Sequence, residues 1–274
     1  MPSLFCDIEL AARIERAEAR LIALVGAATR RRTGSAEGFA IPIAGGLASF
    51  AEKGSPYNKV VGLGFGGVPD VAALDEIEQA FAGRSAPTQI ELAHLADPEI
   101  GELLTARGYR LEAFENVLGL APGLERAAPA GIEVRSSGEL ELDSWIDVIV
   151  DAVAHPDPQG LPWHEEFPRE ILENAERDSA SAGLARYAAL RDGVLAGGAS
   201  LRIDEGVARR RRDGPGAPPA GDSERAARGP PGGCRGRRLR RRRDHDATRI
   251  AIASERAAPG LRPALHGCRA GQAP

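Results

Sequence analysis

Lysine and long apolar runs are scarce in this 274-residue sequence. Only Lys53 and Lys59 supply lysine while arginine is abundant, which is typical of a gene from GC-rich DNA. No run is long and apolar enough to cross a membrane, and the N-terminus lacks the order of basic flank, apolar stretch and small-residue cleavage site found in signal peptides. We therefore expect a cytoplasmic protein with no membrane partner.

Cysteine is scarce as well. Cys6, Cys234 and Cys268 are far apart and in no CxxC spacing, so neither a disulfide framework nor a zinc site is indicated. One Pro-rich loop, residues 155–168, holds two histidines and two glutamates that could in principle bind metal. Without a third well-spaced ligand we interpret them as solvated loop residues, and we predict no metal site.

Aromatic residues are missing after Tyr187, and the charge changes sign near the same region. From Arg209 onward there are 17 arginines and six acidic residues, a balance of +11, whereas the rest of the chain has 18 basic and 33 acidic residues, a balance of −15. The net charge of −4 is the sum of these two unlike balances. A segment rich in Arg, Pro and Gly cannot bury enough apolar surface to offset its ordering entropy, so we predict disorder from 208 to 274.

Before Ala208, segments with strand and helix patterns alternate, which predicts an α/β layer arrangement. Asp70 is the expected N-cap of a helix whose Leu74, Ile77 and Phe81 share one face, and Pro98 is expected to open the helix that ends at 108. Asp192-Gly193 is the expected turn of a hairpin. The expected helices are 4–32, 70–81, 98–108, 140–153 and one that ends near 178. The expected strands are 59–65, 88–92, 131–135, 185–193 and 194–206, together with a strand pair or a strand and loop within 39–50 and a strand or hairpin at 109–120.

A Pro- and Ala-rich stretch, APGLERAAPAG, separates two such series of elements and is a linker candidate. We predict an N-terminal half over 1–122, a linker over 123–130, a second half over 131–207 and a tail over 208–274.

The order of these elements resembles a tandem, two-half protein of the GNAT N-acetyltransferase family. In the second half a strand, a helix, a Pro-rich loop, another helix and a hairpin that ends in LAGGASLRIDEG follow one another; in the first half VVGLGF and TQIEL precede LLTARGYRLEAFENVLGL. The resemblance implies two GNAT-like α/β halves with mixed sheets flanked by helices, the second incomplete and followed by the disordered tail. It also implies acetyl transfer from acetyl-CoA to an amine of a small molecule or protein.

The family holds the CoA pyrophosphate on backbone N–H groups of an R/Q-x-x-G-x-G/A loop at a helix N-terminus. No such loop follows Val207, and the first half shows none, so no cofactor-binding residue is recognisable and the chain as it stands should have little or no activity. In the family the Pro-rich loop lies where acceptors often bind. This makes Trp163 a candidate acceptor contact and Glu165 a candidate base for the amine.

The genetic code offers an explanation for the missing loop. Read one base forward, the codons of Ala217 to Ala227 are compatible with H-R-R-R-G-I-Q-S-A-L-L, which resembles the family loop. In the same register, the codons around Ala257 to Leu265 allow V-Q-R-R-G-F-D-L-L, and those that follow allow Y-T-x-A-V-L-V. We therefore expect a reading-frame shift near Ala208, either a sequencing artefact or a genuine shifted gene.

Two other interpretations stay open at this point. The arginine runs 209–212 and 237–243 could neutralise phosphates, so a non-enzymatic α/β protein with a basic arm for nucleic acid is the alternative function. No aromatic residue is interleaved for base stacking, so we expect incidental charge. GLGFGG (62–67) could suggest a dinucleotide fold, but no acidic partner lies at the right distance and we expect only a strand end and a turn. The sequence leaves the acceptor and the oligomeric state open.

Overall fold

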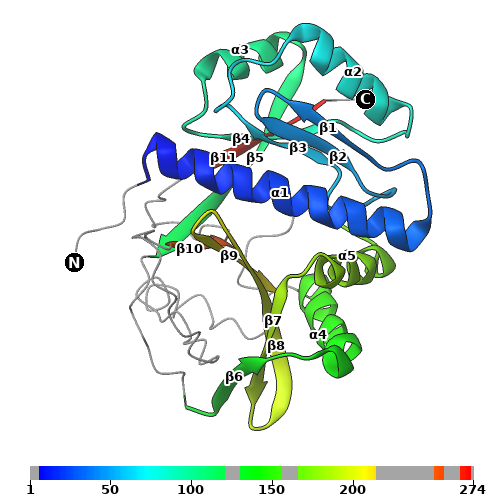
Figure 1. The fold of residues 1–274 in the computed structure, drawn as a ribbon, viewed down its shortest axis with the longest axis vertical. Coiled ribbons are helices and arrows are strands. Elements are labelled where there is room, and N and C mark those ends of the chain that lie inside the picture. The colour runs from blue at the N-terminus through cyan, green and yellow to red at the C-terminus, as the bar shows by residue number, and fades with distance from the viewer. Residues whose placement is uncertain (1–5, 121–129, 156–165, 214–249, 256–265, 273–274) are drawn as a thin grey trace. The chain divides into compact units, whose positions relative to one another are not determined.

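The computed structural model describes residues 6–120, 130–155, 166–213, 250–255 and 266–272 (Figure 1). The chain forms two compact units of mixed α/β structure, which confirms the predicted fold class. The first unit comprises residues 1–118, 164–182 and 262–274, and the second comprises 119–163 and 183–261. Among the described residues no helix has both the length and the apolar character needed to cross a membrane.

The first unit is built on a mixed sheet with strand order β1-β2-β3-β4-β11-β5. Strands β3 and β4 are parallel, and the other neighbours within this unit are antiparallel. Its elements in chain order are α1 (Ile8–Thr33), β1 (Phe39–Ile43), β2 (Gly46–Phe50), β3 (Lys59–Leu63), α2 (Val71–Ala82), β4 (Gln89–Ala93), α3 (Pro98–Ala106), β5 (Tyr109–Leu120), α5 (Arg169–Ser181) and β11 (His266–Gln272).

The apolar core of the first unit lies between one face of this sheet and helices α2 and α3. The expected buried face of α2 is confirmed, because Leu74, Ile77 and Phe81 have no exposed surface. Asp70 is the N-cap of α2, and Pro98 opens α3, both as predicted.

Helix α1 packs on the opposite face of the sheet. Neighbouring residues of a strand point to opposite faces, so Ser49 of β2 faces away from the core that holds Phe50. A Cβ built on Gly26 of α1 would lie 3.3 Å from the Ser49 hydroxyl oxygen, which shows how closely the helix approaches the strand.

Helix α5 packs against α1 within the first unit, although it follows the second unit's α4 in the sequence. The two oxygens of the buried Asp178 carboxylate accept hydrogen bonds from Arg32 Nε at 3.0 Å and Nη2 at 2.9 Å. Asp178 Oδ2 also accepts from the Thr29 hydroxyl at 2.8 Å. Nearby, the Tyr57 and Ser179 hydroxyls lie 2.7 Å apart. The buried Thr29–Asp178 hydrogen bond joins residues 149 positions apart in the sequence.

The second unit has the sheet order β10-β9-β8-β7-β6, in which β9 and β10 are parallel and the other pairs antiparallel. Its elements are β6 (Ile132–Ser136), the 3-10 helix η1 (Glu139–Glu141), α4 (Leu142–Ala154), β7 (Ala185–Arg191), β8 (Val194–Asp204), β9 (Val207–Asp213) and β10 (Ile250–Glu255).

The hairpin predicted at Asp192-Gly193 is present and joins β7 to β8. Both turn residues have positive φ, +51° and +78°, as a two-residue hairpin loop that matches the strand twist requires. Glu205-Gly206, with φ of +46° and +74°, makes a second turn of the same kind, from β8 into β9.

The expectation of disorder from 208 onward differs from the structure in three segments. Residues 207–213 continue the sheet as β9, 250–255 pair with β9 as β10, and 266–272 join the first unit as β11. Local composition argued against these strands, but strand pairing is a long-range interaction that local composition does not encode. The remainder of the predicted tail lies outside the described residues.

Candidate functional site

The turn before α2 is the place in the first unit where a phosphate could meet backbone N–H groups, because α2 joins the parallel strands β3 and β4. The glycines of this turn instead allow close backbone packing. Gly64 has φ of +108°, and a Cβ there would lie 2.1 Å from the Ala96 Cβ. A Cβ on Gly66 would lie 2.4 Å from the Ala44 carbonyl oxygen. Packing therefore accounts for these glycines without a bound nucleotide.

The N-terminus of α2 is capped by a carboxylate. Asp70 Oδ1 accepts a hydrogen bond from the Ala72 amide at 3.0 Å, which occupies one of the free N–H groups of the first turn. The preceding residue, Pro69, has no N–H to offer. A negative charge at the helix N-terminus stabilises the helix dipole but repels a second anion. These residues do not fit a pyrophosphate.

The second unit repeats the arrangement of parallel strands with β9 and β10. Ile250 lies opposite Val207, and Ala253 lies opposite Arg210. The chain between these strands, residues 214–249, lies outside the described residues. The family loop expected from the resemblance falls in that interval, so the described residues provide no cofactor-binding residue in this unit.

Helix α4 packs closely against the hairpin formed by β7 and β8, and β8 pairs with β9. Trp145 is 1 % exposed, and its Nε1 donates a hydrogen bond to the Tyr187 carbonyl oxygen at 2.9 Å. A Cβ on Gly198 would lie 2.3 Å from that nitrogen, so only glycine leaves room for the indole. The neighbours Ile146, Ile149 and Val150 are also buried. This packing gives the strands next to the expected cofactor loop a firm support.

The carboxylates of Glu139 and Glu141, just before α4, form ion pairs with arginine residues. Glu141 accepts a hydrogen bond from Arg135 Nη1 at 2.9 Å, and this bond holds the pKa of Glu141 below its usual value. Glu139 accepts one from Nη2 of the buried Arg186 at 2.7 Å. Because the Glu141 carboxylate is paired with arginine and its pKa is lowered, it is a poor acceptor for a substrate proton.

The acceptor-site candidates Trp163 and Glu165, with His164 between them, lie outside the described residues. Of the same loop, His155 and Glu166 are described and exposed, and His155 Nδ1 lies 3.0 Å from the Asp151 carbonyl oxygen. Within the described ranges no group of three or more His, Cys, Asp or Glu side chains could hold a metal ion.

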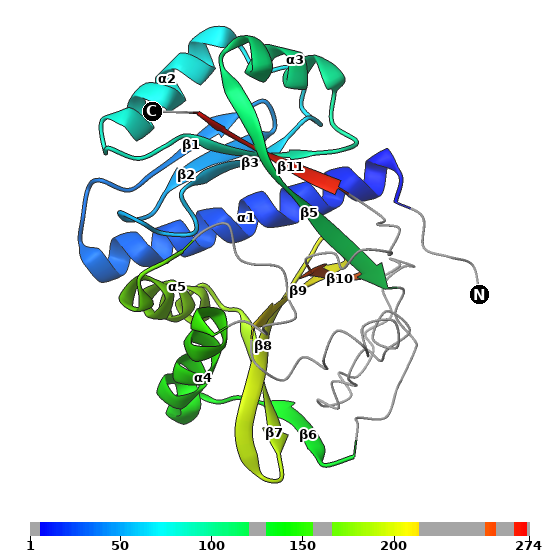
Figure 2. The same ribbon diagram turned by 180° about the vertical axis from the view of Figure 1, so that it is seen from behind.

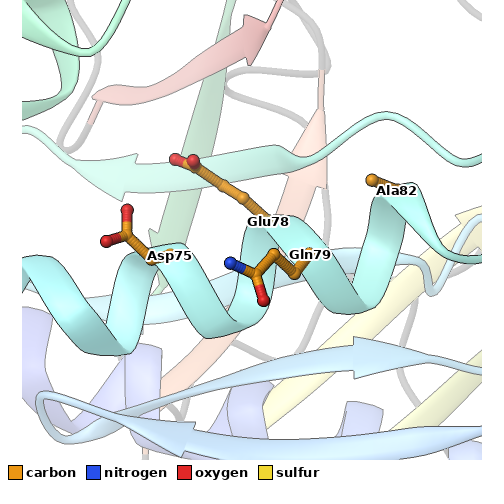
Figure 3. A pocket seen from close by; sticks show the side chains of 4 residues that line it. All are labelled: Asp75, Glu78, Gln79 and Ala82. Carbon is orange, nitrogen blue, oxygen red and sulfur yellow. The ribbon is translucent and has the colours of Figure 1, made fainter.

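A surface pocket on α2 is lined by Asp75, Glu78, Gln79 and Ala82 (Figure 3). Arg107 donates to Glu78 Oε2 at 2.7 Å and also pairs with Asp75, and these bonds raise the pKa of Arg107. The Tyr109 hydroxyl donates to Glu78 Oε1 at 3.0 Å. Burial is the main reason why the pKa of Tyr109 is raised. The sequence predicts the helix that ends at 108 but not this cluster, which joins α2 to β5 and brings no nucleophile or base to a substrate site.

Comparison with known proteins gives a result for the fold only. No protein-family model matches the sequence, and no curated protein matches it. Among solved structures, a tandem GNAT protein from the clavulanic acid biosynthesis pathway has 11 % identity over 82 % of this chain and 78 % of its own, with a TM-score of 0.47. A GCN5-related N-acetyltransferase from Sphaerobacter thermophilus has 14 % identity over 94 % and 93 %, with a TM-score of 0.44.

A GCN5-related N-acetyltransferase from Kribbella flavida is more similar. It has 18 % sequence identity and a TM-score of 0.58, and the match covers 97 % of this chain and 96 % of that one. The likeness extends over both units rather than one. The chain therefore has the mixed α/β fold of a GCN5-related N-acetyltransferase.

Proposed function

We propose that this chain derives from a tandem GNAT N-acetyltransferase that transfers acetyl from acetyl-CoA to an amine of a small molecule or protein. The observation that carries the proposal is the fold likeness to the Kribbella flavida N-acetyltransferase along nearly the full length of both chains.

The internal repetition of the fold supports the two-half interpretation. In the first unit an antiparallel pair, β2 and β3, leads into the parallel pair β3 and β4. In the second unit β8 and β9 lead in the same way into β9 and β10. The carboxylate cap at Asp70 makes the first unit a poor pyrophosphate site, so we assign acetyl-CoA binding to the second half and a structural role to the first.

The position of β9 supports the reading-frame shift. Strand β9 ends at Asp213, and the shifted string H-R-R-R-G-I-Q-S-A-L-L begins at position 217. Three intervening residues are a suitable length for the turn from a strand into a phosphate-binding loop and helix. As encoded, Ala217 to Ala227 supplies no such loop, so we expect the chain as it stands to be inactive.

In the frame-restored protein the amine nitrogen attacks the thioester carbonyl carbon. A C–N bond forms, the C–S bond breaks and CoA leaves as a thiolate. The base takes the amine proton and passes it to the thiolate sulfur, so CoA is released as a thiol and the base is regenerated. Glu165 is the candidate base and Trp163 the candidate acceptor contact.

The test is calorimetric titration of acetyl-CoA into the chain as encoded and into a chain with the frame restored after Ala208. We expect binding by the restored chain only. A matched control is the restored chain with glutamate in place of the glycine encoded at position 221, which should abolish binding by adding a negative charge to the loop. If a folded restored chain does not bind acetyl-CoA, the proposal is wrong. Resequencing of the genomic DNA decides between an artefact and a genuine shifted gene.

The fold likeness does not favour the alternative, a basic arm that binds nucleic acid. That function predicts salt-sensitive binding of DNA or RNA that disappears when the chain is truncated after Gly206. The cytoplasmic location stays a prediction.

A further inference from the structure

Strand β11 occupies an interior position in the first unit, between β4 and β5 (Figures 1 and 2). It is antiparallel to β4, with Gly271 opposite Gln89, and antiparallel to β5, with Gln272 opposite Tyr109. The first unit thus holds two strands that flank a third from far along the chain. The β4–β5 slot, as we name this place, accepts a strand through backbone hydrogen bonds on both sides.

The slot adjoins the apolar core. Position 270 lies opposite Ile90, which has no exposed surface, and position 268 lies opposite Leu92, which packs against the core. Residues directly opposite each other on antiparallel strands share a face of the sheet. An interior strand beside a core is normally rich in β-branched and other apolar residues.

The encoded segment does not meet this requirement. Residues 266–272 read H-G-C-R-A-G-Q, with two glycines and no β-branched residue. Glycine weakens a strand interior because it has no side chain to pack and loses more backbone entropy than other residues.

The shifted frame fits the slot better. Taken codon by codon, V-Q-R-R-G-F-D-L-L covers positions 256–264 and Y-T-x-A-V-L-V begins at position 265, which places leucine at 270 and valine at 269 and 271. Two positions are constrained by the genetic code. Histidine and cysteine codons end in a pyrimidine, so the shifted codon at 266 can encode only threonine or methionine, and the one at 268 only alanine or valine. Position 268, beside the core, is therefore apolar whichever codons the gene uses.

We propose that the β4–β5 slot is a strand-acceptor site for an apolar strand, and that its intended occupant is the shifted-frame segment T-x-A-V-L-V at positions 266–271. The proposal rests on the reading-frame shift of the proposed function. It adds that the shift damages the first unit as well as the cofactor loop of the second.

The experiment restores the strand alone, in the otherwise unchanged full chain. The variant carries His266→Thr, Cys268→Ala, Arg269→Val, Ala270→Leu and Gly271→Val. The matched control carries the same changes except Arg269→Pro, because proline removes a ladder hydrogen bond from an interior strand. Thermal unfolding and hydrogen exchange of the β4 and β5 amides are measured for both variants and the parent.

We expect the restored strand to raise the Tm by about 5 °C and to slow amide exchange in β4 and β5 at least about tenfold. The proline control should show neither effect. If the restored variant matches the parent, or if the control matches the restored variant, the proposal is wrong.

A second measurement tests the same slot if the restored variant is poorly soluble. A labelled peptide containing Y-T-G-A-V-L-V is titrated into the encoded full chain by fluorescence anisotropy, beside a peptide with proline in place of the first valine. Binding of the first peptide at least about tenfold tighter than the second supports the slot, and equal binding overturns it. None of these readouts involves acetyl-CoA, so failure of the slot and failure of the transferase proposal are distinguishable.

Discussion

Asp178→Asn should be among the most damaging conservative changes in the first unit. The Asp178 side chain is 4 % exposed, and its carboxylate accepts from two nitrogens of Arg32 and from Thr29. In asparagine an NH2 group replaces one carboxylate oxygen, so a hydrogen-bond donor faces the donors of Arg32 and Thr29, and the negative charge that pairs with Arg32 is lost. Removal of one partner of a buried ion pair costs about 3–5 kcal/mol. Arg32 is 28 % exposed and keeps its contact with Glu52, so we expect Asp178→Asn to lower the free energy of unfolding by a smaller amount, about 2–3 kcal/mol.

The assay is urea unfolding followed by circular dichroism, with hydrogen exchange of the α5 amides as a local readout. Glu173→Gln is the matched control on the same helix. It removes an exposed pair with Arg169, which should be worth about 0.3–0.5 kcal/mol. If Asp178→Asn destabilises no more than Glu173→Gln, the α1–α5 contact does not have the energetic role that its geometry indicates.

Two further predictions concern packing and reactivity. Gly64→Ala should destabilise the first unit by more than about 2 kcal/mol in urea unfolding, because it combines a left-handed φ with a clash against Ala96. Gly67→Ala has a similar φ but open space around it, so it should cost only about 1 kcal/mol; equal losses would refute the steric argument. Burial, and to a smaller degree Asp7, raises the pKa of Cys6 to about 11. In a variant whose other cysteines are serine, Cys6 should react with a thiol reagent at pH 8 about a hundredfold more slowly than a free cysteine. The reaction rate should rise as the pH approaches 11. Fast labelling of Cys6 at pH 8 would contradict this prediction.

Local features were predictable because they depend on neighbouring residues. The N-cap at Asp70, the turn at Asp192-Gly193 and the apolar face of α2 each follow from a short pattern, and each is present. Helix α5 was also expected, and it extends to Ser181 rather than ending near 178.

Long-range features were not predictable. Nothing near Asp178 indicates that its partner is Arg32, and nothing in residues 266–272 indicates an interior strand, because both depend on segments far away in the sequence. The Glu78–Arg107 cluster was missed for the same reason. The predicted domain boundaries stay predictions: the sequence groups α5 with its neighbours, whereas the contacts place it in the first unit.

For the candidate site, the sequence predicted the order of the surrounding helices and strands, and the fold comparison supports this order. Trp163 and Glu165 remain predictions. The sequence of the first half contains no pyrophosphate loop. In the structure, the Asp70 carboxylate caps the α2 N-terminus, where a bound anion would otherwise lie.

The path of the chain has a consequence for the order of folding. The first unit takes α5 from residues 169–181, after the chain has passed through β6 and α4 of the second unit, and β11 from 266–272, after it has passed through the rest of that unit. Contacts between such distant segments form slowly, because a long loop must close before they stabilise anything. During synthesis, residues 6–120 therefore emerge well before the helix and the strand that complete their unit. Until those segments arrive, the α1 surface and the two strand edges are exposed, and the nascent chain is open to aggregation.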